Sequence, residues 1–260
     1  MKVGLIVSNG FDILKISKKW THLNVETKYG VIPFNKTNVE GVEVYCTTRN
    51  GFSTSCPPHK VNYIGIINAL KKINVNCILG TSVVGSLKKS LSPGTIVILD
   101  QFLDFTKNIK TSYYSDDGFS FCDFTNPYCA SSNKILESIC EDEKLNYKSN
   151  GCYVGVDGPR YETAAEVKMF GILGGDVVGM TNIPEITMSR EAGICYSSIA
   201  IVVNYGAGIE GIVTRKDCHD KTVEYISLLE NMMLNFIKKI KNSMSNCECQ
   251  MASSEFLTYK

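Results

Sequence analysis

Residues 158–208 contain several side chains that together could bind a small polar ligand. They include the aromatic ring of Tyr161, the carboxylate of Glu162, the hydroxyl of Thr181 and the primary amide of Asn204. An aromatic ring can stack on a flat ligand, a carboxylate accepts hydrogen bonds, and an amide both donates and accepts them. A hydroxyl can donate to an anion. This combination suits a sugar, a purine and a phosphate that are bound together.

Each of these residues also has a purely structural interpretation. Glu162 precedes an expected helix, and carboxylates are favoured at that end of a helix. Asn204 ends a long apolar run, where an asparagine can serve only as a turn residue. The end of a strand is nevertheless where α/β folds present groups to a ligand, so the functional interpretation stays open.

Three shorter segments could hold an anion, because each follows or ends an apolar run that is expected to be a strand. They are the turn at residues 8–10, the pair at residues 49–50 and the stretch at residues 80–86. Turn N–H groups, an arginine guanidinium and hydroxyls all bind phosphate oxygens. Taken alone, each segment fits an ordinary turn or an isolated surface arginine at least as well. The stretch at 80–86 lacks the lysine of a phosphate-binding P-loop, which disfavours a nucleoside triphosphate.

The sequence offers little support for covalent or metal catalysis. His219 is a lone histidine near the start of the last expected helix, and no Ser-His-Asp or Cys-His set can be recognised. The 11 cysteines are scattered along the chain, and most are expected to pack as small apolar side chains. Only Cys247 and Cys249 are close in sequence, with no histidine beside them. We therefore expect no metal site, and either idle thiols in a frayed tail or a strained local disulfide.

Composition and charge exclude several classes of protein. The 260 residues include 27 Lys and Arg against 26 Asp and Glu, a formal net charge of +1. Such a balance does not favour binding to nucleic acid or to a membrane surface. The sequence shows neither a charged-then-apolar leader nor an apolar run long enough to span a bilayer. A soluble cytoplasmic protein is expected.

The chain alternates short apolar strands with amphipathic helices, which predicts an α/β fold. Strands are expected near residues 2–7, 42–47, 77–79, 95–99, 152–156 and 195–203, and helices near 59–72, 131–143, 163–172, 184–192 and 222–241. Residues 107–127 lack periodicity and are expected to form a long loop. No repeat or linker divides the chain, so we predict one domain over residues 1–245, followed by a tail at 246–260.

In these motifs the chain resembles the trimeric purine nucleoside phosphorylase and methylthioadenosine phosphorylase family. The resemblance runs from residue 3 to about residue 241 and is most specific at residues 57–63, 100–106, 158–163 and 178–181. It implies a single α/β domain with a central mixed sheet surrounded by helices. It also implies a homotrimer or a dimer of trimers, with active sites near the subunit boundaries. Inorganic phosphate would be the co-substrate, with no cofactor.

The resemblance assigns roles to individual residues. Arg49, Glu162 and Asn204 would be catalytic. The phosphate site would comprise Asn9, Gly10, Arg49, Asn50, Ser82, Val83 and Thr181. The nucleoside site would comprise Tyr161, Glu162, Met180, Asn204, Gly206 and His219, with Phe121 reaching into a neighbouring subunit's sugar pocket. The family usually has Thr or Ser where Asn9 stands and His where Asn50 stands, and a further loop histidine corresponds to Thr54.

The implied reaction is phosphorolysis of a purine nucleoside to the free base and ribose 1-phosphate, a step of purine salvage. An amide at Asn204 can donate to a 6-oxo group, and Glu162 can accept N1–H, which a 6-oxopurine has and adenine lacks. Inosine and guanosine are therefore the expected substrates. Phe121 offers an apolar surface that keeps methylthioinosine and methylthioadenosine open. The changes at Asn9 and Asn50 leave open a homologue that binds nucleosides with impaired phosphorolysis.

Overall fold

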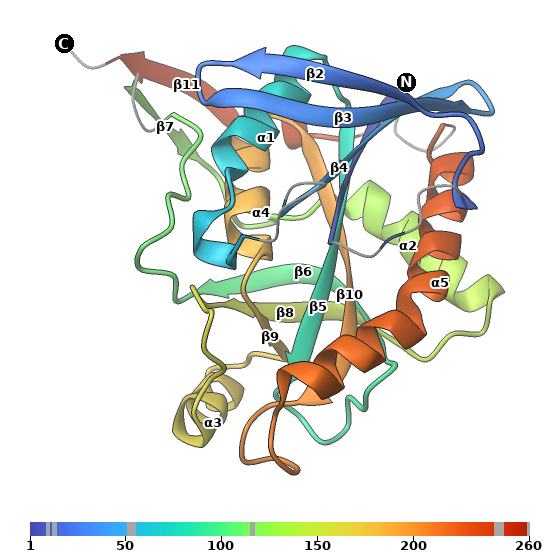
Figure 1. The fold of residues 1–260 in the computed structure, drawn as a ribbon. Coiled ribbons are helices and arrows are strands. Elements are labelled where there is room, and N and C mark those ends of the chain that lie inside the picture. The colour runs from blue at the N-terminus through green and yellow to red at the C-terminus, as the bar shows by residue number, and fades with distance from the viewer. Residues whose placement is uncertain (9–10, 12–14, 51–55, 115–117, 242–246, 259–260) are drawn as a thin grey trace.

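A mixed β-sheet surrounded by helices forms the centre of the protein (Figure 1). The structure is a computed structural model that describes residues 1–8, 11, 15–50, 56–114, 118–241 and 247–258, and within these residues nine strands form this sheet. The strands are β1 (Lys2–Val7), β2 (Thr21–Thr27), β3 (Gly30–Val39), β4 (Val42–Thr48), β5 (Cys77–Ser86), β6 (Ile96–Asp104), β8 (Tyr147–Gly155), β9 (Val177–Gly179) and β10 (Cys195–Tyr205). The predicted α/β fold with a central mixed sheet is confirmed.

Part of the sheet closes on itself. Strand β10 pairs in parallel with β5 and antiparallel with β6, and the order β6, β8, β9, β5 completes the ring. Strands β1, β4, β3 and β2 continue the sheet outward from β5. In this register Gly85 lies opposite both Val178 and Asn204. The ends of β5, β9 and β10 therefore meet at one place, although they are far apart in sequence.

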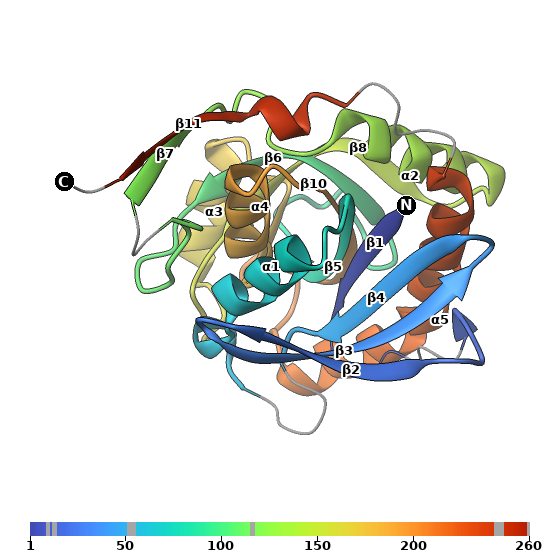
Figure 2. The same ribbon diagram turned by 90° about the horizontal axis from the view of Figure 1, so that it is seen from above.

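Helices cover both faces of the sheet (Figure 2). One core packs α1 (Tyr63–Lys72) and α4 (Asn182–Glu191) against the sheet, and the other packs α2 (Ala130–Asp142) and α5 (Arg215–Ile240). A smaller core lies under α3 (Ala164–Ile172). None of the helices in the described ranges is long and apolar enough to cross a membrane.

The apolar run that predicted β10 is explained by burial on both faces. Ile199 and Ile201 belong to the core beneath α2 and α5, whereas Ala200 and Val202 belong to the core beneath α1 and α4. Consecutive side chains of a strand point to opposite faces, so a strand that is covered on both sides must be apolar throughout. Burial of each large apolar side chain contributes roughly 1.5–3 kcal/mol.

Two segments expected to be loops belong to strands. Residues 80–86 form the second half of β5, because β10 continues to pair with the strand through Ser86. Strand β7 (Gly118–Cys122) interrupts the loop expected at residues 107–127. The last helix begins at Arg215 rather than at residue 222, because the Thr214 hydroxyl caps it by accepting the Asp217 N–H at 3.1 Å.

The expectation of a frayed tail is wrong, whereas Cys247 and Cys249 are free thiols rather than a local disulfide. The C-terminal segment contains the 3-10 helix η3 (Cys249–Met251) and strand β11 (Ser253–Thr258), which pairs antiparallel with β7 (Figure 1). Cys247 and Cys249 lie against Cys129 and Cys195 in the interior. Sequence spacing could not reveal this contact, because the sheet and α2 bring the other two cysteines to the tail.

Candidate functional site

A cavity of about 220 Å³ opens where the ends of β5, β9 and β10 meet. The segment before α3 and the start of α5 complete its wall. The lining residues are Ser8, Pro58, Val83, Val84, Gly85, Tyr161, Glu162, Val178, Gly179, Met180, Thr181, Val203, Asn204 and Cys218. The structure thus brings together six of the predicted site residues, namely Val83, Tyr161, Glu162, Met180, Thr181 and Asn204.

Six other predicted residues are described but do not line the cavity, and four of them, Arg49, Asn50, Ser82 and Gly206, have partners in the interior or in the backbone. Arg49 is 3 % exposed and lies behind Ser8, to which it donates a hydrogen bond at 3.2 Å. The Asn50 amide donates to the Cys56 carbonyl at 2.7 Å. Ser82 is fully buried, with its hydroxyl 3.4 Å from that of Ser198, and Gly206 donates its N–H to a backbone carbonyl of β5.

The remaining predicted residues lie elsewhere. His219 is exposed on α5, whereas the preceding residue, Cys218, lines the cavity. Adjacent helical residues point about 100° apart, so only one of the two can face the cavity. Phe121 is 81 % exposed on β7 and packs edge-to-face against Phe119. Asn9, Gly10 and Thr54 lie outside the described residues.

Sequence reasoning missed several residues of this wall. Ser8 stands in the turn that was assigned to anion binding, but only its two neighbours were chosen. Pro58 stands in the motif at residues 57–63, which was given no site role, and Cys218 is one of the scattered cysteines. Signals existed for Ser8 and Pro58, because both stand in segments already singled out. Nothing local distinguished Cys218 from the other cysteines.

The amide of Asn204 is held on both sides. Its Nδ2 donates to the Tyr205 carbonyl at 2.7 Å, and its Oδ1 accepts from the Cys218 thiol at 3.4 Å. Burial raises the pKa of the Cys218 thiol, although a hydrogen bond with Tyr161 opposes this, so the thiol keeps the proton that it donates. A primary amide has two N–H donors and two acceptor lone pairs. Each end of the Asn204 amide therefore retains capacity for a ligand.

Glu162 and Tyr161 also line the cavity, on the segment that precedes α3. Burial raises the pKa of the Glu162 carboxyl above its usual range. Burial, followed by the hydrogen bond with Cys218, raises the pKa of Tyr161 to about 12. Tyr161 is therefore neutral near pH 7. The Glu162 carboxyl therefore keeps its proton to a higher pH than an ordinary glutamate does.

The segment carrying Tyr161 approaches β9 very closely at Gly158. A Cβ at Gly158 would lie 2.3 Å from the Met180 sulfur, and the backbone φ of +65° is one that residues with side chains rarely adopt. Glycine is therefore required here. The absence of a side chain at Gly158 leaves room for Met180, which lines the cavity and stands between β9 and α4 in the chain.

Thr181 stands at the N-cap of α4 but makes no side-chain cap hydrogen bond. The backbone N–H groups of Thr181 and Asn182 donate to the Tyr153 hydroxyl at 3.1 and 3.3 Å. A helix N-terminus carries partial positive charge, which favours an anion. This end of α4 faces the cavity through Thr181.

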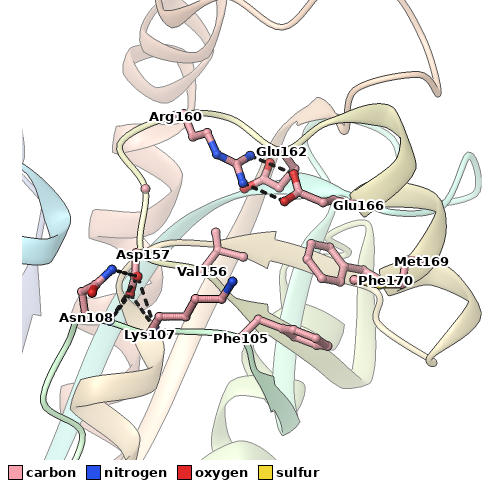
Figure 3. A pocket seen from close by; sticks show the side chains of 11 residues that line it. Phe105, Lys107, Asn108, Val156, Asp157, Arg160, Glu162, Glu166, Met169 and Phe170 are labelled. Atoms are coloured by element: carbon pink, nitrogen blue, oxygen red, sulfur yellow. Dashed lines mark hydrogen bonds and ion pairs between the residues drawn. The ribbon is translucent and has the colours of Figure 1, made fainter.

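A second hollow of about 330 Å³ shares Glu162 with the cavity. Figure 3 shows the side chains that line this second hollow. Arg160 binds both carboxylate oxygens of Glu166 at 2.7 and 2.8 Å. Asp157 accepts from the backbone and the side chain of Asn108 at 3.2 and 3.0 Å. These contacts secure the segment that carries Glu162 from both sides, as the dashed lines in Figure 3 show.

Comparisons with known proteins agree with the architecture. A family model described as Phosphorylase superfamily matches residues 2–238. A probable 6-oxopurine nucleoside phosphorylase from Dictyoglomus turgidum is 39% identical over 259 residues, which cover 98% of each chain. A probable S-methyl-5′-thioinosine phosphorylase from Methanopyrus kandleri is 35% identical over 255 residues, 96% of this chain and 97% of the relative. The crystal structure of a methylthioadenosine phosphorylase from an Antarctic soil metagenomic library superposes with a TM-score of 0.90 at 25% identity, covering 99% of this chain and 92% of that one.

Proposed function

The chain belongs to the phosphorylase superfamily, and on that premise we propose that it cleaves 6-oxopurine nucleosides with inorganic phosphate. Inosine and guanosine would give the free base and ribose 1-phosphate, a reaction of purine salvage. The observation that carries the proposal is that Asn204 and Glu162 line one cavity together with Thr181. Relatives of this chain bear the name 6-oxopurine nucleoside phosphorylase, which supports the same substrate class.

The base edge is where the proposal is most specific. Asn204 retains one N–H for a 6-oxo group and one lone pair for a proton on N7. Glu162, as a carboxylate, accepts N1–H. Adenine offers an amino group at position 6 and no N1–H, so it would leave buried groups unpaired at a cost of about 1–3 kcal/mol each.

The reaction needs stabilisation at two ends of the bond that breaks. As the C1′–N9 bond lengthens, positive charge develops on the sugar and negative charge on the purine. Phosphate near the α4 N-terminus and Thr181 would support the sugar and then form the new C1′–O bond. Donation from the Asn204 amide would stabilise the leaving base more strongly as its charge grows. No covalent enzyme intermediate is required.

A second substrate class is favoured by one observation. Cys218 lines the cavity, whereas His219, the polar residue that the resemblance assigned to the nucleoside site, is exposed. The wall also includes Pro58, Val178 and Val203, so much of its surface is apolar. These features suit a 5′-methylthio group, and several relatives bear the name probable S-methyl-5′-thioinosine phosphorylase. We therefore propose methylthioinosine phosphorolysis as the alternative activity.

The subunit arrangement is part of the proposal. We propose a homotrimer, in which the exposed ring of Phe121 reaches the sugar pocket of a neighbouring subunit. Sedimentation of the purified protein tests the trimer. Phe121→Ala tests the contact, because loss of a neighbour's apolar contact should raise KM for the nucleoside without changing KM for phosphate.

Release of free base from inosine, guanosine, adenosine and the two methylthio nucleosides, with and without phosphate, tests the whole assignment. The expected result is phosphate-dependent release with inosine or guanosine preferred. A preference for methylthioinosine would select the alternative. Equal turnover of adenosine would overturn the proposed roles of Asn204 and Glu162. Nucleoside binding without release at any phosphate concentration would identify a binding homologue, and release without phosphate a hydrolase.

A further inference from the structure

Four cysteines from distant parts of the chain converge at the end of the fold opposite the substrate cavity. Cys129 is the N-cap of α2, Cys195 is the first residue of β10, and Cys247 and Cys249 flank the start of η3. Their thiol sulfurs all lie within 4.8 Å of one another. Cys195 and Asn204 stand at opposite ends of the paired length of β10, which corresponds to roughly 30 Å at the rise of a strand.

The sulfurs form a compact group rather than two separate pairs. The Cys247 sulfur lies 3.1 Å from that of Cys195 and 3.5 Å from that of Cys129, so it has no single partner. Four thiolates around a zinc ion at about 2.3 Å are separated from one another by roughly 3.8 Å. The observed spacing therefore needs only a small adjustment to enclose one ion. Cys-x-Cys spacing lets two ligands come from one turn of the tail.

The surroundings of the cluster suit thiolates. Arg190 donates from Nη1 to the Cys249 sulfur at 3.8 Å, and the Cys249 N–H donates to the Cys247 sulfur at 3.4 Å. Cys129 stands at the N-terminus of the 13-residue α2, where the helix dipole stabilises negative charge. A zinc ion with four thiolates carries a net charge of −2, and these donors offset it. Hydrogen bonds of this kind are typical of the groups around metal ligands.

We propose that Cys129, Cys195, Cys247 and Cys249 bind one structural Zn²⁺ ion. Binding releases the four thiol protons and involves no change in oxidation state. Four protein ligands fill the tetrahedral coordination of zinc, so no position is left for a substrate, and the site is structural. Its role is to attach the C-terminal segment, including β11, to α2 and β10. Cys129, Cys195 and Cys249 are buried, so the site is shielded from solvent.

Metal analysis of the full-length protein tests the proposal. Protein prepared under reducing conditions with zinc in the medium should contain about one zinc ion per chain, as measured by inductively coupled plasma mass spectrometry. Cys247→Ser and Cys249→Ser should each lose it. Cys122→Ser is the matched control, because Cys122 lies on β7, which pairs with the same C-terminal segment, and its thiol is outside the cluster. This control should retain the zinc.

Cobalt gives a spectroscopic readout that does not depend on enzyme activity. Co²⁺ added to the chelator-treated wild-type chain should produce the visible bands of tetrahedral cobalt together with thiolate-to-cobalt charge-transfer bands. Zinc should then displace it. Removal of zinc should lower the Tm by at least about 4 °C, and its return should restore it. Phosphorolysis is not used as the readout, so failure of the proposed function would leave this test intact.

Several results would overturn the zinc site. One is a zinc content well below one ion per chain while the four thiols of the cluster still react with a thiol reagent. The others are iron in place of zinc, two disulfides among the four cysteines in the reduced preparation, or zinc retained by the serine variants. If the serine variants fail to fold, the cobalt titration of the wild-type chain decides the question, since absence of the charge-transfer bands excludes four thiolate ligands.

Discussion

Arg49 and Glu185 form an ion pair in the interior, although they are 136 residues apart in sequence. Both side chains are 1% exposed. The Arg49 Nη2 donates to Glu185 Oε2 at 3.2 Å, and the Tyr196 hydroxyl donates to the same oxygen at 2.7 Å. Arg49 Nη1 also donates to the Ser8 hydroxyl, which lines the cavity. The pair therefore connects the buried end of β4 and helix α4 to the cavity wall.

Glu185→Gln should damage both stability and phosphate binding. The substitution leaves the Arg49 charge buried without its partner, which typically costs about 3–5 kcal/mol of unfolding free energy. Chemical denaturation measures this loss. The KM for phosphate should also rise. Arg49 without its partner no longer holds the Ser8 hydroxyl in place, and Ser8 belongs to the turn that is expected to bind the anion. Glu224→Gln breaks the exposed pair with Lys221 and should leave both quantities unchanged. Wild-type stability in the Glu185 variant would exclude a structural role for the pair.

Asn204→Asp should shift the preference from inosine towards adenosine. A carboxyl group at this position accepts from a 6-amino group but loses the N–H that faces a 6-oxo group. With about 1–3 kcal/mol for each mismatched polar contact, the ratio of kcat/KM for inosine over adenosine should fall roughly 5- to 150-fold. Asn38→Asp, at an exposed position on β3, introduces the same charge far from the cavity and should leave the ratio unchanged. An unaltered ratio in the Asn204 variant would place the base elsewhere.

Cys218 should position the Asn204 amide through its S–H donor. Cys218→Ala removes that donor and should lower kcat/KM for inosine several-fold, since one hydrogen bond contributes about 0.5–1.5 kcal/mol. Cys218→Ser keeps a donor and should restore most of the activity. The comparison separates positioning from simple loss of volume. Equal activity of the alanine and serine variants would exclude the positioning role.

The pH dependence of inosine turnover should report on Glu162. Only the carboxylate accepts N1–H, and burial raises its pKa, so kcat/KM for inosine should fall on the acidic side as pH drops through that raised value. Glu162→Gln should lower activity and remove this acidic limb. A pH profile that is identical in both proteins would assign the limb to another group.

The same raised pKa has a consequence for stability. Between the usual pKa of a glutamate and the raised value, the folded state binds more protons than the unfolded state. Stability therefore decreases as pH rises through this interval and stays lower above it. Glu162→Gln should accordingly raise the Tm near pH 7, and the gain should disappear in acid. Thermal unfolding at several pH values measures it.

The sequence alone determined the class of fold and pointed to several residues that line the candidate cavity. The apolar run of β10 had to be covered on both faces, and the motif at residues 158–163 led to Tyr161 and Glu162. Asn204 could be predicted as a ligand-binding residue because it lies at the carboxyl end of a buried strand, where α/β folds bind their ligands. These features depend on local periodicity and on the positions of strand ends, and both can be recognised within one short segment of the sequence.

Tertiary structure decided which neighbours face the cavity and what lies behind them. Cys218 rather than His219 points into it because packing sets the rotation of α5, and sequence adjacency says nothing about that rotation. The sequence predicted a helix around Glu185 but gave no sign that Glu185 pairs with Arg49, because the two meet only when α4 packs against the end of β4. The four cysteines converge only after β10, α2 and the C-terminal segment have packed together. Contacts between distant segments depend on strand register and helix rotation, and the whole core fixes both.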